Sequence, residues 1–207
     1  MKSILKEFKD QKKRKLLIVI SGPTCAGKDA IIKSLLKRNK NITRLVTTNS
    51  RLKRAGEKEG VDYYFVSKDQ FEKLISRDAF FEWVEYRGDY RGTQKKHVKQ
   101  FLESGKDVIW RIDVRGVKNV YRKVKKEIPF SVFIFVGERL SILEKRLKKR
   151  ATENKKWRDW SKNRAKWELA QFARNFDYLV LNKQGKLKKT VRIIKGIIES
   201  ERRRLKA

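Results

Sequence analysis

The stretch Leu16-Leu17-Ile18-Val19-Ile20-Ser21-Gly22-Pro23-Thr24-Cys25-Ala26-Gly27-Lys28-Asp29 decides the fold. A short apolar run leads into the pattern Gly-x-x-x-x-Gly-Lys, and apolar residues at helical spacing follow at once. This order of strand, glycine-rich loop and helix is typical of a P-loop, whose backbone N–H groups bind a polyphosphate. We therefore predict a nucleotide-binding loop made by Gly22, Pro23, Thr24, Cys25, Ala26, Gly27, Lys28 and Asp29.

The last position of this loop departs from the usual motif. A P-loop normally closes with Ser or Thr, whose hydroxyl binds Mg²⁺, whereas this chain has Asp29. A carboxylate can also hold a hydrated magnesium ion, although it adds negative charge beside the phosphates. We predict Mg²⁺ as the metal and Asp29 as its protein ligand.

Length and composition restrict the class of protein. The chain has 207 residues, which is enough for one domain with small insertions, and its formal net charge is +32. Such a charge favours anionic partners, nucleic acid among them, but the basic residues are spread over the whole chain and can equally be solvated lysine faces.

A single cysteine excludes an intramolecular disulfide, and no apolar run approaches the length of a membrane span. We expect a cytoplasmic protein without a membrane partner, either a monomer or a homodimer.

Alternating strand and helix patterns follow the P-loop and predict a parallel sheet covered on both faces. A segment of mixed strand and helix patterns interrupts this alternation after the predicted strand 42–46. It begins with a basic loop over 47–60. The predicted elements are helix 28–38, strand 42–46, strand 63–66, helix 68–76, strand 80–86, helix 94–103, strand 107–112, helix 114–125, strand 131–136, helix 140–150, helix 168–174, strand 178–181 and a helix from 187.

These patterns divide the chain into segments. Residues 151–165 are polar, charged and poor in core residues, which is typical of a mobile lid. The predicted organisation is a basic N-terminal arm (1–15), core (16–46), substrate-binding insertion (47–93), core (94–150), lid (151–165), and core with a basic C-terminal helix (166–207).

Three further motifs follow the P-loop in a fixed order: an arginine-rich loop with a Gly-Val-Asp-Tyr-Tyr-Phe-Val segment within 47–66, a Phe-Glu-Trp segment within 81–93, and Ile-Asp-Val-Arg-Gly at 112–116. Together with the P-loop they resemble the guanylate kinase family, from Leu16 to the C-terminus. Residues 47–57, Thr-Thr-Asn-Ser-Arg-Leu-Lys-Arg-Ala-Gly-Glu, resemble the family's GMP loop, and 60–66, Gly-Val-Asp-Tyr-Tyr-Phe-Val, resemble the strand after it. Residues 81–93, Phe-Glu-Trp-Val-Glu-Tyr-Arg-Gly-Asp-Tyr-Arg-Gly-Thr, are similar to its Phe-x-Glu-Trp … Gly-Asn-Tyr-Tyr-Gly-Thr/Ser segment. Residues 112–116, Ile-Asp-Val-Arg-Gly, are similar to its Ile-Asp-x-Gln-Gly.

This resemblance implies an α/β P-loop kinase fold with a parallel five-stranded core sheet, a small mixed α+β GMP-binding insertion and a helical lid. It implies transfer of the γ-phosphoryl group of ATP to GMP or dGMP, which gives ADP and GDP and requires Mg²⁺. The small-molecule partners would therefore be ATP and GMP.

The resemblance also implies roles for individual residues. Forked arginine donors suit phosphate, and a buried carboxylate suits the N1–H and 2-amino group of guanine, which is the role implied for Glu82. The residues implied at the GMP site are Thr47, Arg51, Arg54, Tyr63, Glu82, Arg91, Thr93 and Asp113. The catalytic residues implied are Lys28, Arg51, Arg146 and Arg150.

Four positions depart from the family pattern. Asp29 replaces the hydroxyl residue of the P-loop, and Arg91 stands in place of a phosphate-binding tyrosine. Arg111 stands in place of the first acid of an Asp-Ile-Asp strand end. Ser161 stands in place of a lid arginine, and Arg158 and Arg164, three residues to either side, are candidates to substitute for it. Asp after the P-loop lysine also occurs in ribose bisphosphate phosphokinases, which share the fold. Three alternatives therefore stay open: a related P-loop kinase with a different acceptor, a silent guanylate-kinase-like binding module, and a protein that also binds nucleic acid.

Overall fold

The computed structural model describes residues 15–204 except 87, 129, 149–154 and 171–173. The predicted N-terminal arm up to residue 14 and the predicted lid arginine Arg150 lie outside the described residues.

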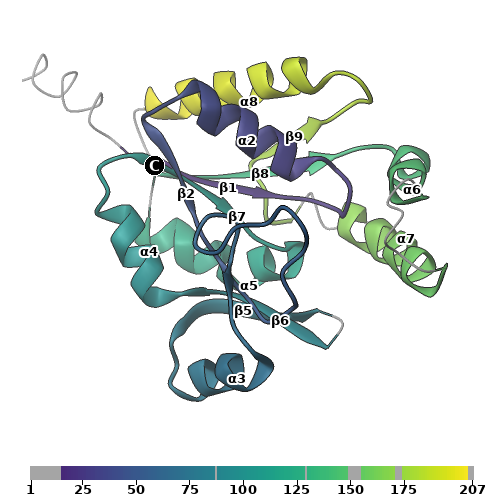
Figure 1. The fold of residues 1–207 in the computed structure, drawn as a ribbon. Coiled ribbons are helices and arrows are strands. Elements are labelled where there is room, and N and C mark those ends of the chain that lie inside the picture. Colours follow the sequence, from purple (N-terminus) through teal and green to yellow (C-terminus); the bar gives the residue numbers. More distant parts are fainter. Residues whose placement is uncertain (1–14, 87, 129, 149–154, 171–173, 205–207) are drawn as a thin grey trace, which may run out of the picture.

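A five-stranded sheet forms the centre of the molecule (Figure 1). Its order is β2-β7-β1-β8-β9, and all neighbouring pairs are parallel, which confirms the predicted core sheet. The strands are β1 (Leu17–Ser21), β2 (Ile42–Leu45), β7 (Asp107–Arg111), β8 (Ser131–Gly137) and β9 (Tyr178–Leu181). Parallel pairing aligns their carboxyl ends along one edge of the sheet, where ligands of open α/β sheets bind.

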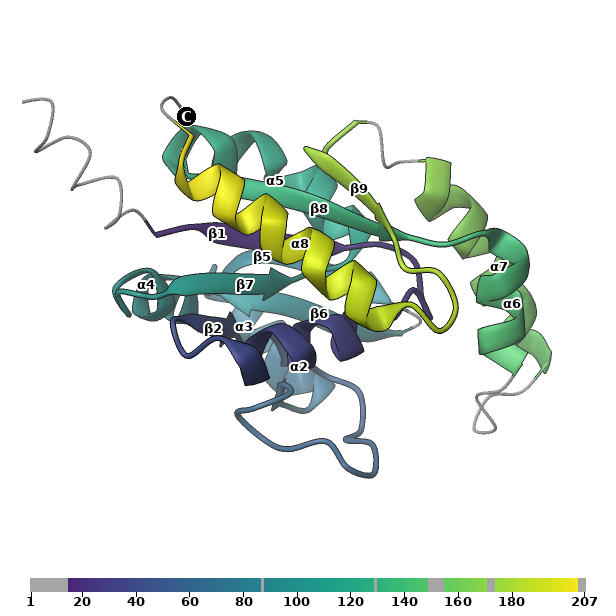
Figure 2. The same cartoon turned by 90° about the horizontal axis from the view of Figure 1, so that it is seen from above.

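Helices cover both faces of this sheet, as Figures 1 and 2 show. Ile18 and Ile20 of β1 pack with α2 (Lys28–Arg38) and α8 (Leu187–Arg202), whereas Leu17 and Val19 pack with α4 (Lys95–Leu102) and α5 (Val114–Glu127). The alternation follows from the two-residue period of a strand, which points successive side chains to opposite faces.

The segment between β2 and α4 forms a second, four-stranded sheet with the order β4-β3-β6-β5. Its elements are β3 (Thr48–Asn49), β4 (Tyr64–Phe65), α3 (Lys68–Ser76), β5 (Phe80–Tyr86) and β6 (Asp89–Gln94). Helix α3 begins at a capping box in which Ser67 and Gln70 satisfy each other's backbone N–H groups, and its predicted bounds are confirmed.

Two strands of this second sheet were not predicted. Residues 47–60 were expected to be a loop, but two of them form β3, and no element was predicted for most of β6. Neither strand has an apolar alternation of its own. β3 pairs with β6, which lies about 40 positions further along the chain, and β6 is the second strand of a hairpin with β5.

Helices α6 (Leu140–Lys148) and α7 (Lys155–Ala170) lie together at one end of the core sheet (Figure 2). The prediction of a helix that begins only at residue 168 was wrong, because α7 already includes most of the predicted lid. Ala165 and Glu168 are buried and give α7 a contact with the body of the protein. In the part of the chain that the structure describes, no helix is long and apolar enough to span a membrane.

Candidate active site

A cavity of about 480 Å³ lies between the carboxyl edge of the core sheet and the second sheet. It brings together most of the predicted site residues: Gly22, Thr24, Cys25, Gly27, Lys28, Asp29, Thr47, Arg51, Arg54, Tyr63, Glu82, Arg91, Asp113 and Arg146. Pro23 and Ala26 are buried behind its surface, and Thr93 is buried against Glu82.

The P-loop needs glycine at its first position. Gly22 has φ +137°, and a Cβ there would meet the backbone oxygen of Val136 at 2.1 Å. Gly27 and Cys25 also have positive φ, 89° and 66°, so the loop curls tightly between β1 and α2. Behind the loop, Asn182 donates from Nδ2 to the Ala26 carbonyl at 2.8 Å.

Lys28 is buried and folds back over the loop. Its Nζ donates to the carbonyls of Gly22 at 2.6 Å and Pro23 at 2.8 Å. Burial lowers its pKa to about 8, and the nearby charge of Arg111 acts in the same direction. The ammonium is therefore held in the loop where a phosphate would arrive.

Arg146 of α6 joins this side of the cavity. Its Nη1 donates to the carbonyl of Cys25 at 3.1 Å, and its Nη2 donates to the carbonyl of Asn182 at 2.9 Å. Glu138 lies 3.5 Å from the same nitrogen. Arg146 thus connects α6 to the P-loop.

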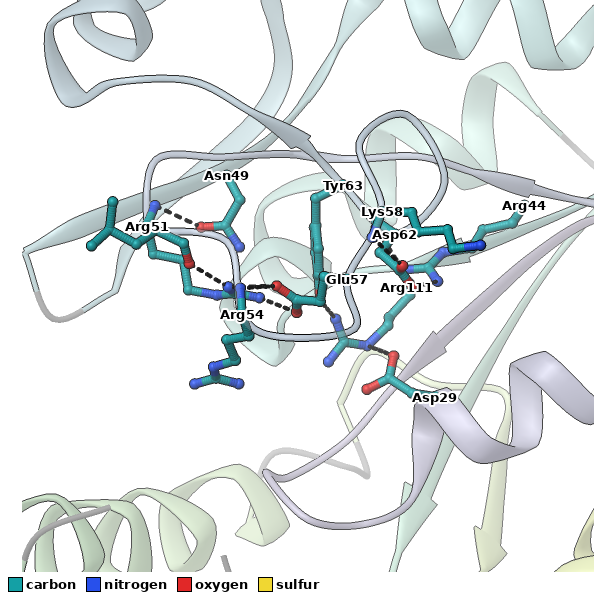
Figure 3. A network of polar contacts seen from close by, with 11 residues as sticks. Asp29, Arg44, Asn49, Arg51, Arg54, Glu57, Lys58, Asp62, Tyr63 and Arg111 are labelled. Carbon is teal, nitrogen blue, oxygen red and sulfur yellow. Dashed lines mark hydrogen bonds and ion pairs between the residues drawn. The ribbon is translucent and has the colours of Figure 1, made fainter. Parts of the chain in front are cut away.

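The basic loop of the second sheet is ordered by an internal ion pair. Glu57 binds both terminal nitrogens of Arg51 and accepts the backbone N–H of Arg54 at 2.9 Å (Figure 3). Although burial acts in the opposite sense, these donors lower the pKa of Glu57. The Arg51 guanidinium also lies 5.3 Å from the ring centroid of Tyr63. A bidentate pair of this kind fixes the arginine in place.

Glu82 lies across the cavity from the P-loop, on β5. It is 8% exposed, and burial raises its pKa to about 7. Thr93 of β6 donates to Glu82 Oε1 at 2.7 Å, and Trp110 of β7 donates from Nε1 to the Thr93 hydroxyl at 2.9 Å. A buried carboxylate with a fixed orientation and only part of its acceptor capacity used can recognise a ligand that carries N–H donors.

Asp113 combines a structural position with a place in the cavity. Its carboxylate accepts the backbone N–H of Arg115 and so caps the N-terminus of α5. The same carboxylate accepts two bonds from Arg164 Nη2, at 2.8 and 3.1 Å, while Arg164 Nε donates to Glu168 at 2.8 Å. Of the two arginines considered in place of one at residue 161, Arg164 therefore reaches the cavity wall. The side chains of residues 158 and 161 lie outside the described part.

Two departures from the family pattern meet in space. Arg111 Nε lies 3.1 Å from Asp29 Oδ1, and Arg111 Nη1 donates to the hydroxyl of Tyr63 (Figure 3). The unusual acid of the P-loop and the unusual base at the end of β7 thus form an ion pair.

Three charged residues of the cavity lining were not in the predicted site: Glu57, Arg111 and Glu168. Glu57 lies within the quoted GMP-loop pattern, so its position was visible in the sequence, although its pairing was not. Arg111 was noted only as a departure. No sequence pattern marked Glu168 as a site residue. Burial raises its pKa to about 7, and the nearby charge of Asp113 acts in the same direction.

Metal binding by protein groups alone is not supported in the described ranges, because no group of three or more His, Cys, Asp or Glu side chains gathers there. Asp29 offers a carboxylate at the cavity, with a side chain that is 59% exposed. Mg²⁺ bound mainly by water and nucleotide phosphates needs only one or two carboxylates, so the donor set fits that ion.

A P-loop with a buried lysine, faced across one cavity by an arginine-rich loop and a buried acid, defines a P-loop phosphotransferase. Comparisons with known proteins make the class more specific. The family model for guanylate kinase matches residues 13–201. The guanylate kinase of Carboxydothermus hydrogenoformans is 40% identical over 188 residues, which cover 90% of this chain and 89% of that protein. The guanylate kinase of Thermotoga maritima is 38% identical over 187 residues, with 90% and 87% covered.

The solved structures agree. The crystal structure of guanylate kinase from Anaplasma phagocytophilum matches with a TM-score of 0.71 and 25% identity, covering 92% of this chain and 88% of that one. The chain belongs to the guanylate kinase family, whose members are ATP-dependent nucleoside monophosphate kinases.

Proposed function

We propose that this protein transfers the γ-phosphoryl group of ATP to GMP or dGMP, giving ADP and GDP. The observation that carries the proposal is the position of Glu82: a buried carboxylate in the same cavity as Lys28, across from the P-loop. One side of the cavity suits a polyphosphate and the other suits a base with adjacent N–H donors.

The donor nucleotide would bind along residues 22–29. The backbone N–H groups of the loop and the N-terminus of α2 would hold the ATP phosphates, and the Lys28 ammonium would leave the Gly22 and Pro23 carbonyls to contact them. Arg146, which reaches the loop from α6, would approach the phosphoryl group in transfer. Arg150 is proposed for the same task from the resemblance alone.

The acceptor nucleotide would bind on the second sheet. Arg51, Arg54, Tyr63 and Arg91 line the cavity with phosphate-binding donors. Glu82 would accept the N1–H and 2-amino group of guanine. Adenine would leave that carboxylate unpaired, which is the basis of discrimination. The remaining guanine contacts are proposed for Thr47, Thr93 and Asp113.

Mg²⁺ would be held by the phosphates, by water and by the Asp29 carboxylate. The ion supplies charge neutralisation at the β- and γ-phosphates. The chain itself would position the phosphates of ATP and GMP, and it would exclude water when the lid closes over them. Closure and the division into core, insertion (47–93) and lid (151–165) are part of the proposal.

The first experiment is to measure ADP release from ATP and Mg²⁺ with GMP, dGMP, AMP, CMP and UMP offered separately. Turnover confined to guanine nucleotides supports the proposal. Turnover with another acceptor, a ribose bisphosphate included, supports a related kinase. GMP binding without turnover of any acceptor supports a binding module.

The proposal extends to location and assembly. Cys25 of the P-loop is the single cysteine of the sequence, so an intramolecular disulfide is excluded, which fits a reducing cytoplasm. The proposed assembly is a monomer or a homodimer.

A second role in binding nucleic acid is favoured only by the charge of +32. Part of that charge lies on the exposed sides of the neighbouring helices α2 and α8, at Lys33, Lys37, Lys188, Arg192 and Lys195. Binding to unrelated RNA and DNA that falls steeply with salt would support this role, and no binding at physiological salt would remove it.

A further inference from the structure

Arg111 occupies the place where the two nucleotide sites meet. It is the last residue of β7, and its side chain is 20% exposed within the cavity wall. Its Nε is paired with Asp29 of the P-loop, at 3.1 Å, and its Nη1 donates to the hydroxyl of Tyr63, which directly precedes β4 of the second sheet (Figure 3). A single side chain therefore connects the donor side with the acceptor side.

The surroundings keep Arg111 charged and oriented. Burial by itself would lower its pKa, but Tyr63 and Asp29 raise the pKa above its ordinary value. The Tyr63 ring lies 5.9 Å from the guanidinium carbon and adds a cation–π contact. A cation held in this way needs little reorganisation when charge develops next to it.

The ion pair between Arg111 and Asp29 also offsets an electrostatic repulsion between Asp29 and a bound polyphosphate. A carboxylate at position 29 would repel the ATP phosphates, and the repulsion between charges a few ångströms apart is strong in a partly buried site. Arg111 offsets that charge through its ion pair with Asp29. When phosphates and a cation arrive at Asp29, the guanidinium faces new anions within its reach.

We propose that Arg111 is a phosphate-contacting catalytic residue that binds the phosphoryl group in transfer between ATP and GMP. The inference rests on the proposed function of the cavity. A guanidinium has five N–H donors and can contact phosphate oxygens while it keeps its bond to Tyr63. In the transfer, the bond from the γ-phosphorus to the β-bridging oxygen breaks and its electron pair leaves with ADP. A bond to a phosphate oxygen of GMP forms, and Arg111 stays protonated throughout.

The rival role is that Arg111 only neutralises Asp29. The two roles predict different results for a double variant. If neutralisation is all that Arg111 does, then Arg111→Ala in an Asp29→Ser background should be nearly as active as Asp29→Ser. If Arg111 contacts the phosphates, the double variant should stay as slow as Arg111→Ala.

The test measures kcat and both KM values for the wild type, Arg111→Ala, Arg111→Gln, Asp29→Ser and the double variant. Calorimetry with GMP and ADP in the absence of Mg²⁺ adds a readout that does not depend on turnover. We expect kcat to fall about 100-fold or more in both Arg111 variants and in the double variant. Affinity for GMP should fall about tenfold. Recovery of kcat in the double variant, or a loss below about threefold in Arg111→Ala, would overturn the proposal.

Arg44→Ala is the matched control. Arg44 also lies over the Tyr63 ring, at 5.7 Å, and donates to the Asp62 carbonyl at 2.9 Å, but the described lining of the cavity does not include it. The kcat of Arg44→Ala should stay within about threefold of the wild type, and thermal unfolding of each variant shows whether that variant is folded.

If the wild type itself turns over no nucleotide, the proposed function fails. The calorimetry still decides Arg111, because unchanged GMP and ADP affinities in Arg111→Ala would contradict a phosphate contact.

Discussion

The two sides of the cavity are built in different ways. The proposed donor side is one continuous stretch, residues 22–29, in which the backbone would provide the phosphate donors and Lys28 folds back on its own loop. The proposed acceptor side collects side chains from the arginine-rich loop after β3, from β5 and β6, from the end of β7 and from the start of α5. A local site can be recognised in a short motif, whereas an assembled site exists only after the two sheets have packed together.

The two sides also differ in how they handle charge. The donor side buries a lysine whose pKa falls to about 8, and the acceptor side buries Glu82, whose pKa rises to about 7. Desolvation is the largest cause in both. Lys28 donates to two carbonyls and Glu82 accepts from Thr93, so each keeps hydrogen-bonding capacity for a ligand of opposite character. The following experiments test whether the two sides act separately.

The largest effect is expected from Lys28→Ala on the donor side. Loss of the buried ammonium should lower kcat about 1,000-fold or more, because phosphoryl transfer depends on positioning and charge neutralisation. The steady-state release of ADP measures it, and Lys33→Ala on the exposed side of the same helix is the control. GMP affinity should change little, and a large loss of GMP binding would show that the two sides are coupled.

On the acceptor side, Glu82→Gln should lower kcat/KM for GMP about 100- to 1,000-fold, since the amide presents an N–H where guanine also presents donors. Affinity for ADP should remain near that of the wild type. Glu85→Gln, on the exposed face of the same strand, provides the comparison. Unchanged GMP kinetics in Glu82→Gln would remove this residue from guanine recognition.

Gly22→Ala tests whether the donor side is made by its backbone. The new Cβ would meet the Val136 carbonyl oxygen at 2.1 Å and would force an alanine into φ +137°. We expect a loss of about 2–4 kcal/mol in the free energy of unfolding, measured by denaturant titration. Gly56→Ala separates the two causes, because Gly56 has φ +81° but open space around its Cβ position. Equal losses in both variants would mean that the contact with β8 is not the cause.

The smallest effect is the pH dependence of kcat/KM for GMP. Glu82 must be ionised to accept hydrogen bonds from guanine, and burial raises its pKa to about 7. The kcat/KM for GMP should therefore fall up to tenfold for each pH unit below about pH 7. Lys28 must be protonated to bind phosphate, so kcat/KM for GMP should fall again when the pH rises above about 8, the pKa of Lys28. In Glu82→Gln the acidic limb should flatten. A limb that survives there would report Glu168 instead, whose pKa also lies near 7.

Much of the fold followed from local patterns. The P-loop, the bounds of α2 and α3, and the strand and helix alternation from residue 107 to 147 were all predicted, because apolar periodicity and capping residues act within a few positions. The family could be recognised for a related reason, since its motifs keep a fixed order along the chain. The failures were β3, β6 and the start of α7. The strands have little structure without partners, and polar sequence hid the buried contacts of α7 at Ala165 and Glu168.

The sequence by itself determined the donor side of this protein, because glycine spacing, a lysine and a helix start are local chemistry. The tertiary structure alone decided which polar groups meet: Arg111 with Asp29 and Tyr63, Arg51 with Glu57, and Arg164 with Asp113. Arg111 and Tyr63 are separated by 48 positions, and no local pattern shows that a strand end and a loop will face each other. Two residues that look like separate departures in the sequence form one ion pair in the fold, because parallel strands bring distant chain segments to one edge of the sheet.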